Sequence, residues 1–357
     1  MNQFHSLTVR ELRHETRDAV SMVFDIPEHL EAAYRFKQGQ YLTLRTQLNG
    51  EEVRRSYSIC SGVNDGELRV AVKQVQGGLF STYANQHLAV GDLLDVMPPM
   101  GHFYTELDPE REGNYLLVAA GSGITPIMSI AKTTLEAEPK SHVTLIFGNR
   151  ATSSTMFREQ LTDLKNTYMG RFNLIFVFSR EQQDIDLYNG HIDAQKCQVL
   201  FDRWLDAKQL DAAFICGPQT MTETVRDTLA AAGMATNKIH FELFAAAGNE
   251  RKQEARAAAA EHADVSEVTV VRDGISQTFS VKQNTANLLD AGNEHGADLP
   301  FSCKAGVCST CKCKVIEGDV DMDISIGLED YEVEAGYVLS CQSFPMSKRV
   351  VLDFDEV

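Results

Sequence analysis

The sequence has few prolines and few basic residues, and both shortages limit what the chain can be. Only 9 of its 357 residues are proline, while 43% are apolar and 23% charged. This composition is typical of a folded globular protein and not of a disordered one. The 33 basic residues face 50 acidic ones, which gives a net charge of -17. Nucleic acids and anionic membranes attract clustered Lys and Arg, so we expect neither as a partner.

Long apolar runs are also missing. Residues 1–18 hold three arginines among acids and polar residues, without the apolar stretch of a signal peptide. The longest apolar runs, such as residues 115–120, are far shorter than the roughly 20 residues that span a bilayer. We therefore expect a soluble, cytoplasmic protein. In such a chain the eight cysteines are expected to be metal ligands or buried thiols, not disulfides.

The length exceeds what one core usually organises, so we expect several domains, with no internal repeat. Residues 1–108 read as short alternating strands separated by Gly, Asn and Asp, which predicts an all-β barrel. Residues 109–244 alternate buried-strand runs with segments of helical length, which predicts a parallel sheet covered on both faces. The expected strands are 6–12, 19–26, 41–48, 67–75, 93–97, 115–120, 143–147, 173–178 and 212–216, and the clearest expected helix is 124–135.

The last third of the chain is expected to form a separate small domain. Residues 245–264 are rich in alanine and charged residues and lack a strand pattern, so we interpret them as a linker. Within 265–357, the strands expected at 268–271 and 277–281 flank Asp273-Gly274, a strong hairpin signal, and residues 286–295 can form a helix. The predicted domain is a β-hairpin with a helix.

The positions of four cysteines carry the strongest chemical signal. Cys303, Cys308 and Cys311 form C-x4-C-x2-C, and Cys341 follows after a further 29 residues. This is the plant-type spacing of [2Fe-2S] ligands, in which four thiolates hold two irons. A structural zinc site is the alternative, although zinc sites usually show two paired motifs. Cys313, two residues after Cys311, is interpreted as a buried small side chain, and so are Cys60 and Cys197.

Resemblances extend these motifs to a family. The run 299–313, L-P-F-S-C-K-A-G-V-C-S-T-C-K-C, with L-S-C-Q at 339–342, resembles a plant-type ferredoxin domain, which implies a β-grasp fold. Arg55-Ser56-Tyr57-Ser58, at the end of an expected strand, resembles the R-x-Y-S motif of the ferredoxin-NADP reductase family. The resemblance implies FAD, with Arg55 on the pyrophosphate, Tyr57 against the isoalloxazine and Ser58 at flavin N5.

Further residues match the same family and imply the remaining site. Gly77, Gly78 and Ser81 resemble its second FAD element, where glycine amides meet the phosphates. The Gly-rich turn after strand 115–120 resembles its G-x-G-x-T-P, and Cys216 stands where the family places a cysteine near the nicotinamide. Cys216 is alternatively a plain core residue. The residues of the turn are Gly121, Gly123, Thr125 and Pro126.

The choice of nicotinamide cofactor is expected to depend on residues at a strand end. Ser179 and Arg180 follow strand 173–178 and suit the 2′-phosphate of NADPH, with help from Arg150. Because an exposed Arg at a strand end is common without any ligand, NADH remains open. Similar reductases place an aromatic side chain near the flavin at the end of this domain, which implies that role for Phe244.

Three modules in this order imply a converter that passes electrons from NADPH through FAD and a [2Fe-2S] cluster. Residues 265–357 hold 16 acids and 7 bases, a net charge of -9, with eight acids and no base from 317 to 334. This acidic face is either an ordinary solvated surface or a docking surface for a basic patch of the acceptor. The runs 4–9, 34–36, 119–126 and 336–341 resemble reductase components that serve di-iron oxygenases.

Other functions stay open from the sequence. The same domain order serves hybrid-cluster proteins, ring hydroxylases and acyl desaturases as acceptors. A redox-sensing module, which would bind FAD and the [2Fe-2S] cluster but have little catalytic turnover, is an alternative from a different functional class. Steady NADPH oxidation with an artificial acceptor would exclude that module.

Overall fold

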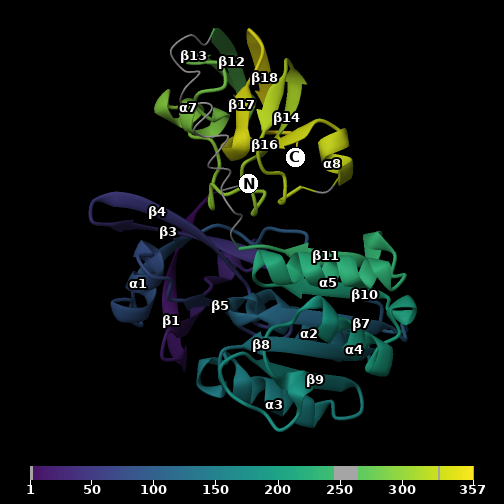
Figure 1. Cartoon of the computed structure of the whole chain (residues 1–357). Helices are drawn as coiled ribbons and strands as arrows, with labels where there is room; N and C mark the ends of the chain where they lie inside the picture. The colour runs from purple at the N-terminus through teal and green to yellow at the C-terminus, as the bar shows by residue number, and fades with distance from the viewer. Residues whose placement is uncertain (1–2, 245–263, 329, 357) are drawn as a thin grey trace. The chain divides into compact units, whose positions relative to one another are not determined.

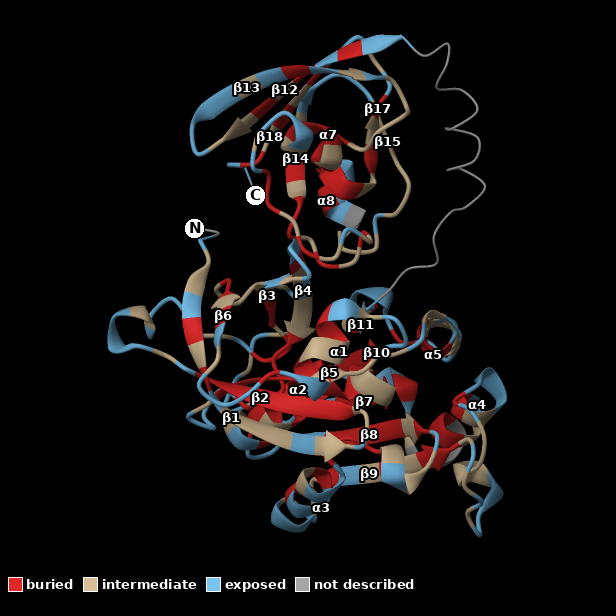
Figure 2. Cartoon of the chain, turned by 90° about the vertical axis from the view of Figure 1, so that its left-hand side faces the viewer, coloured by how far each residue is buried: buried red, intermediate tan, exposed pale blue. Residues whose placement is uncertain are grey.

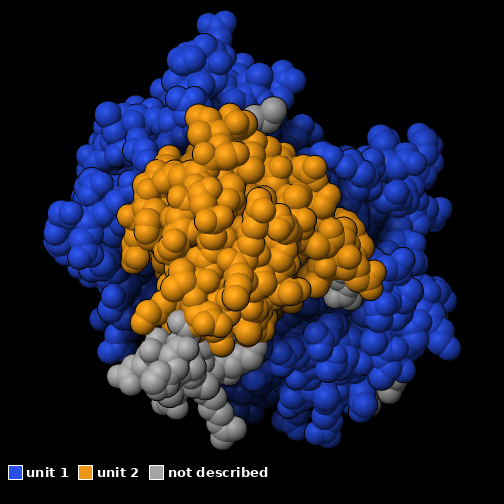
Figure 3. Space-filling model, turned by 90° about the horizontal axis from the view of Figure 1, so that it is seen from above, with its two compact units in different colours: residues 1–243 blue, residues 244–357 orange. Residues whose placement is uncertain are grey.

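The computed structural model describes residues 3–244, 264–328 and 330–356, and the chain divides into two compact units. The first unit comprises residues 1–243 and the second 244–357, as coloured in Figure 3. The expected linker, 245–264, falls outside the described residues except for its last one. Among the described residues, no helix has the length and apolar character needed to cross a bilayer.

The N-terminal part of the first unit is an antiparallel sheet of six strands in the order β4-β3-β6-β1-β2-β5. An isolated bridge between Ile59, just beyond β4, and Val70 of β5 joins the two edge strands, so the sheet closes on itself. Buried apolar side chains of alternating residues fill its interior, as a barrel requires. The elements are β1 (His5–Thr16), β2 (Ala19–Asp25), β3 (Tyr41–Leu48), β4 (Glu51–Ser58), β5 (Leu68–Lys73), α1 (Leu79–Gln86) and β6 (Leu93–Val96).

The rest of the first unit is a parallel five-stranded sheet in the order β11-β10-β7-β8-β9. Strands β7 and β8 are buried along most of their length (Figure 2), because helices cover both faces. Each face has its own apolar cluster, one with α2 and α3 and one with α4 and α5. The elements are β7 (Asn114–Ala120), α2 (Ile124–Ala137), β8 (His142–Asn149), α3 (Arg158–Thr167), β9 (Phe172–Phe178), α4 (Ala194–Trp204), β10 (Ala212–Cys216), α5 (Gln219–Ala231) and β11 (Ile239–Glu242).

The second unit is built on a mixed five-stranded sheet in the order β13-β12-β18-β14-β16 (Figure 1), and β15 and β17 form a separate two-stranded sheet. The predicted hairpin is present: Asp273 and Gly274 both have positive φ and link β12 to β13. Helix α7 packs its apolar side on the sheet. The elements are β12 (Val265–Arg272), β13 (Ile275–Lys282), α7 (Leu288–Glu294), β14 (Lys312–Glu317), β15 (Val320–Met322), α8 (Asp330–Glu334), β16 (Tyr337–Leu339), β17 (Ser343–Pro345) and β18 (Arg349–Asp353).

Candidate functional site

The R-x-Y-S residues occupy the end of β4. Arg55 is exposed and Tyr57 is half-buried, with its ring centroid 5.4 Å from that of Phe80 in α1. Ser58 is buried and ends the strand. An exposed guanidinium beside a packed aromatic ring and a buried hydroxyl can meet the charged, planar and hydrogen-bonding parts of a flavin nucleotide. The residues present therefore fit FAD.

The Gly77-Gly78 turn leads directly into α1. Gly77 has φ +73°, which only glycine adopts readily. A Cβ on Gly78 would stand 2.5 Å from Ser81 Oγ, so the turn has no room for one. The Ser81 hydroxyl accepts from the Val75 N–H and donates to the Gly78 carbonyl, which leaves the amides at the start of the helix as the groups suited to a phosphate.

A second glycine turn follows β7 at the carboxyl edge of the parallel sheet. Gly121 has φ +56°, and a Cβ on Gly123 would stand 2.1 Å from the Cys216 carbonyl oxygen. The Thr125 hydroxyl donates to the Ser122 carbonyl, and Pro126 lies in the first turn of α2, where its missing N–H costs nothing. The turn thus packs against the end of β10, at the edge where open α/β sheets bind nucleotides.

Three polar groups that are distant in sequence meet in the first unit. Cys216 and Glu242 are register partners at the ends of β10 and β11, and the Ser58 hydroxyl donates to Glu242 Oε2 at 3.3 Å. Burial raises the pKa of Glu242 to about 7, although the Ser58 hydrogen bond opposes the rise. Burial, followed by the nearby Glu242 carboxylate, raises the pKa of Cys216 well above its usual range.

This cluster combines a neutral thiol with a carboxyl that can hold a proton near neutral pH. Cys216 is therefore not a thiolate nucleophile. Glu242 was not among the residues expected from the sequence, although it lies within the run H-F-E-L-F at 240–244. Its signal was a lone acid in the last, partly buried strand of a parallel sheet.

The ends of β8 and β9 bring together the residues expected to select the cofactor. The Ser179 N–H donates to the Asn149 carbonyl, and the Arg180 N–H donates to the Arg150 carbonyl at 2.8 Å. Arg150 and Arg180 are both exposed. Two exposed arginines whose backbones are hydrogen-bonded at the carboxyl edge of the sheet can supply guanidinium groups to a phosphate group.

Phe244 does not belong to the first unit. It is exposed and is the first residue of the second compact unit. Its role near a flavin stays a prediction.

The four motif cysteines lie together in the second unit as two thiol pairs. The thiols of Cys303 and Cys308 are hydrogen-bonded to one another, as are those of Cys311 and Cys341. Among the described residues no three His, Cys, Asp or Glu side chains are arranged to hold one metal ion. Two pairs suit a [2Fe-2S] cluster, in which each iron takes two thiolates, better than a four-coordinate zinc ion.

Backbone amides of the cysteine loop point at the sulfurs. The Ala305 N–H donates to Cys303 Sγ at 3.3 Å, and the Cys303 N–H donates to Cys308 Sγ at 3.5 Å. The Cys308 thiol, followed by the backbone N–H groups of the loop, lowers the pKa of Cys303 to about 6. A loop that stabilises negative sulfur fits an iron–sulfur cluster.

The same loop needs an unusual backbone. Gly306 has φ +74°, and a Cβ there would stand 2.7 Å from Ile324 Cγ2. Lys304 and Ser309 also have positive φ, which is strained for residues other than glycine, so the loop is strained at two points around the thiols. Such strain persists where the fold requires the conformation, as it does at functional sites.

The acidic run from 317 to 334 is not uniformly a surface. Glu332 is 8% exposed and pairs with Lys312, Nζ to Oε1 2.8 Å. Glu317 pairs loosely with Arg349 at 3.5 Å, and Asp319 is exposed. The acids available to a partner are therefore fewer than the sequence suggests.

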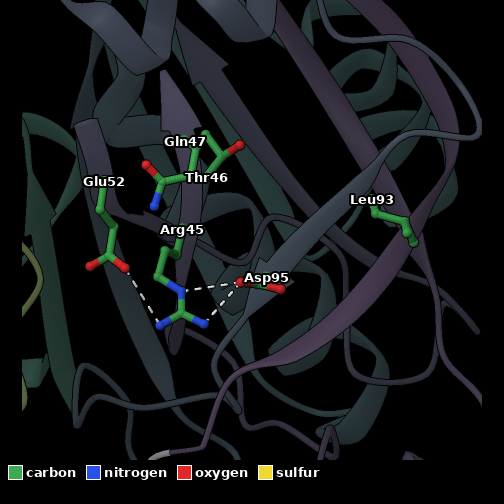
Figure 4. A pocket seen from close by; sticks show the side chains of 6 residues that line it. All are labelled: Arg45, Thr46, Gln47, Glu52, Leu93 and Asp95. Atoms are coloured by element: carbon green, nitrogen blue, oxygen red, sulfur yellow. Dashed lines mark hydrogen bonds and ion pairs between the residues drawn. The ribbon is translucent and has the colours of Figure 1, made fainter. Parts of the chain in front are cut away.

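A pocket of about 420 Å³ lies on β3, β4 and β6, and no predicted site residue lines it (Figure 4). Arg45 dominates it and is held by Asp95 at 2.9 Å and by Glu52 at 3.7 Å. The ring of Phe4 lies 4.0 Å from the Arg45 guanidinium carbon. Arg45 is therefore already paired, and the pocket is not suited to binding an anion.

Comparison with known protein families assigns each part of the chain. Residues 6–104 match the oxidoreductase FAD-binding domain, 117–227 the oxidoreductase NAD-binding domain, and 270–346 the 2Fe-2S iron-sulfur cluster binding domain. The chain therefore belongs to the family of ferredoxin reductases that carry a C-terminal 2Fe-2S ferredoxin domain. It is an oxidoreductase that uses FAD, a nicotinamide cofactor and a [2Fe-2S] cluster in electron transfer.

Full-length relatives narrow the comparison. The chain is 47% identical to a subunit of the 1,2-phenylacetyl-CoA epoxidase of Escherichia coli (strain K12), over 99% of both chains. It is 35% identical to the ferredoxin reductase component of 3-ketosteroid-9-alpha-monooxygenase from Mycobacterium tuberculosis, covering 98% of this chain and 96% of that one. One relative is named as a subunit of an epoxidase and the other as the reductase component of a monooxygenase.

A solved structure shares the whole architecture. Phthalate dioxygenase reductase, described as a modular structure for electron transfer from pyridine nucleotides to [2Fe-2S], superposes with a TM-score of 0.62. It is 25% identical, and the match covers 98% of each chain. The expected fold class is confirmed: an FAD-binding β domain, a parallel-sheet nucleotide-binding domain and a ferredoxin domain.

Proposed function

We propose that this chain is the NADPH-dependent reductase component of a di-iron oxygenase, with phenylacetyl-CoA epoxidase as the acceptor. The observation that carries the proposal is the 47% identity to an epoxidase subunit along 99% of both chains. The paired thiols of the second unit support the electron-transfer role, and the 35% identity to a steroid monooxygenase reductase supports the general class of partner. All eight cysteines are free thiols, which suits the cytoplasm.

The proposed domains are residues 1–108 for FAD, 109–244 for the nicotinamide cofactor, 245–264 as the linker and 265–357 for the cluster. Bound FAD would supply the capacity to take a hydride from the nicotinamide cofactor and to give electrons singly to the cluster. The protein supplies position, exclusion of water and a tuned environment.

The β4 residues are proposed to hold the flavin. Arg55 neutralises the pyrophosphate, and Tyr57, fixed by its contact with Phe80, packs against the isoalloxazine. Ser58 directs its hydroxyl to flavin N5. The amides of the Gly77-Gly78 turn and of the first turn of α1, with Ser81, take the phosphates.

The nicotinamide residues are proposed at the carboxyl edge of the parallel sheet. The turn Gly121–Pro126, including Gly123 and Thr125, holds the cofactor's phosphates, and Cys216 lies against the nicotinamide as a neutral thiol. Phe244 is proposed to lie near the flavin. These roles require no nucleophile.

The carboxyl of Glu242 is a protonatable group that we include in the proposed mechanism. With a pKa of about 7, its carboxyl can hold a proton near neutral pH. When protonated at Oε2 it would donate to Ser58 Oγ, 3.3 Å away, which leaves the Ser58 hydroxyl hydrogen for the flavin. We propose that this pair keeps a hydrogen-bond donor in place at the reacting end of the flavin. Ser58 is buried and Glu242 half-buried, and limited access of water strengthens the hydrogen bond between them.

Cofactor choice is proposed to favour NADPH, with Ser179 and Arg180, helped by Arg150, binding the 2′-phosphate. The exposed, adjacent arginines support this preference. NADH is the alternative, in which these arginines are ordinary surface residues.

Cys303, Cys308, Cys311 and Cys341 are proposed as the four cluster ligands, and the acidic face around residues 317–334 as the docking surface for a basic patch of the oxygenase. The negative balance of this domain supports an attraction that guides encounter more than it adds affinity. Other acceptors, such as a ring hydroxylase, would use the same surface.

The test is reconstitution with the oxygenase subunits of a phenylacetyl-CoA epoxidase. The proteins are mixed anaerobically, air, NADPH and phenylacetyl-CoA start the reaction, and product is followed by mass spectrometry. We expect epoxide only when this chain is present. Reduction of flavin and cluster without product would refute the epoxidase as acceptor and retain the reductase.

Matched cysteine variants test the electron path. Cys308→Ser is expected to retain NADPH oxidation with an artificial dye and to lose delivery to the oxygenase. Cys313→Ala, which alters a fully buried thiol outside the ligand set, is expected to retain both. Full delivery by Cys308→Ser would contradict the assigned path.

A further inference from the structure

The largest fully buried side chain among the described residues is charged. It belongs to Arg69 of β5, which is 1% exposed. A cation is rarely taken out of water unless acids accompany it. The residues around the Arg69 side chain therefore indicate its role.

Two acids of the barrel half accompany Arg69. Its Nε lies 3.1 Å from Glu67 Oε1, and its Nη1 lies 3.9 Å from Glu15 Oε1, with both carboxylates largely buried. Neither Nε nor Nη1 has a hydrogen-bond partner of good geometry among the described residues. Opposite charge, and not an ideal set of hydrogen bonds, holds the guanidinium within the barrel half.

The side chain of Arg69 makes its well-formed hydrogen bond to a residue outside the barrel half. Its Nη2 donates to Gln160 Oε1 at 2.9 Å, in the first turn of α3 of the parallel-sheet half. The guanidinium carbon lies 5.6 Å from the ring of Phe157, the residue before that helix. Phe157 is buried and has φ +55°, a left-handed conformation that is strained for a bulky residue. The start of α3 is thus strained where it meets Arg69.

The backbone of Arg69 is hydrogen-bonded to residues that closely follow the R-x-Y-S motif. Its carbonyl accepts from the Cys60 N–H at 2.8 Å, two residues after Ser58, and its own N–H donates to Ser61 Oγ at 3.2 Å. The helix that its side chain reaches follows β8, and Arg150 is the residue directly after that strand. Arg69 therefore links the strand that ends in Ser58 to the helix after the cofactor-binding edge.

A buried ionic group of this kind contributes little net stability, because removing it from water offsets the attraction. One use of such a group is to specify a single arrangement of the parts that it joins. Hydride transfer needs such an arrangement, since the reacting atoms must lie about 3–3.5 Å apart.

We propose that Arg69 is a positioning residue, which fixes the barrel half against the parallel-sheet half through Gln160 and so sets the approach of the nicotinamide to the flavin. The inference rests on the proposed placement of both cofactors. It assigns Arg69 no contact with either of them.

The test uses the full chain with both of its groups and alters the far end of the link. Gln160→Ala removes the acceptor and leaves the Arg69–Glu67 pair in place. Gln160→Glu restores an acceptor oxygen. Asn166→Ala, an exposed amide on the same helix, is the matched control.

Stopped-flow absorbance gives the flavin-reduction rate and the nucleotide dissociation constant separately, and the long-wavelength charge-transfer absorbance of the flavin–nicotinamide complex reports their stacking. We expect Gln160→Ala to slow reduction at saturating nucleotide by on the order of tenfold and to weaken the charge-transfer absorbance, with the dissociation constant unchanged. We expect Gln160→Glu to recover both and Asn166→Ala to match the wild type.

A lower melting temperature for Gln160→Ala, with wild-type reduction and charge-transfer absorbance, would overturn the inference and leave Arg69 a structural residue. Failure of the proposed function is a different result, because the unaltered chain would then show no flavin reduction by either nucleotide.

Discussion

The pKa of Glu242 makes a prediction that can be worked out in magnitude and sign. Burial raises the pKa from the ordinary 4.5 to about 7. At 1.36 kcal/mol for each pH unit, the difference corresponds to about 3 kcal/mol. The folded protein retains a proton that the unfolded chain has lost between those two values, so stability decreases as pH rises through this window. The contribution of Glu242 to stability does not change with pH below pH 4.5 or above pH 7.

Glu242→Gln removes this ionisation while keeping a side chain of the same shape. We expect the variant and the wild type to be equally stable at pH 4.5, and the variant to be more stable by up to about 3 kcal/mol at pH 8. Urea unfolding, followed by the fluorescence of released flavin, reports on the first unit between these pH values. Glu159→Gln, at an exposed glutamate of α3, is the control.

The result that would refute the reasoning is a constant difference between Glu242→Gln and the wild type across the pH range. It would mean that Glu242 titrates as it does in the unfolded chain, so that no proton is held beside Ser58 at neutral pH. The opposite slope, with the variant less stable as pH rises, would mean that the Glu242 carboxylate is stabilised in the fold.

Three further predictions concern the cofactors and the partner. Arg180→Ala should lower kcat/KM for NADPH about tenfold or more and leave NADH unaffected, since a charge-assisted hydrogen bond contributes about 1.5–3 kcal/mol; equal losses for both would contradict the assignment. Oxygenase reduction should slow steeply between low and physiological salt, whereas a rate independent of salt would exclude steering by the acidic face. Gly306→Ala should lose iron but retain FAD because its Cβ meets Ile324, whereas Gly274→Ala, with φ +72° and open space, should retain both by iron and flavin analysis.

The sequence predicted the architecture of the first unit well because its strands differ in burial. The parallel strands are continuous apolar runs, and those expected at 115–120 and 212–216 agree with β7 and β10 within one residue. Among the antiparallel strands, those expected at 19–26 and 41–48 agree with β2 and β3 within one residue. Of β4 only the end, at the R-x-Y-S motif, was expected, and β1 extends to Thr16, well beyond the expected end at residue 12. Pairing with β2 on one side stabilises these polar residues as strand, which a local pattern does not show.

The sequence predicted less of the ferredoxin unit. The hairpin around Asp273-Gly274 and helix α7 were expected, but strands β14 to β18 and helix α8 were not. Several of these elements span only three to six residues, and short elements lack a periodic signal. The cysteine spacing nevertheless identified the centre of this unit, because it depends on a single loop and on one returning strand.

What the sequence could not reveal is how distant residues complete one another. Ser58 was expected at the flavin, yet its partner Glu242 lies 184 positions away and was not among the residues expected from the sequence. Arg69 and Gln160 are 91 positions apart, and neither lies in a motif. A sequence motif identifies residues that lie in one loop. A site that holds a proton, or a hydrogen bond between the barrel half and the parallel-sheet half, is formed by residues that are far apart in the sequence. If Gln160→Ala changes the charge-transfer absorbance, the Arg69–Gln160 pair positions the nicotinamide against the flavin and does not serve packing alone.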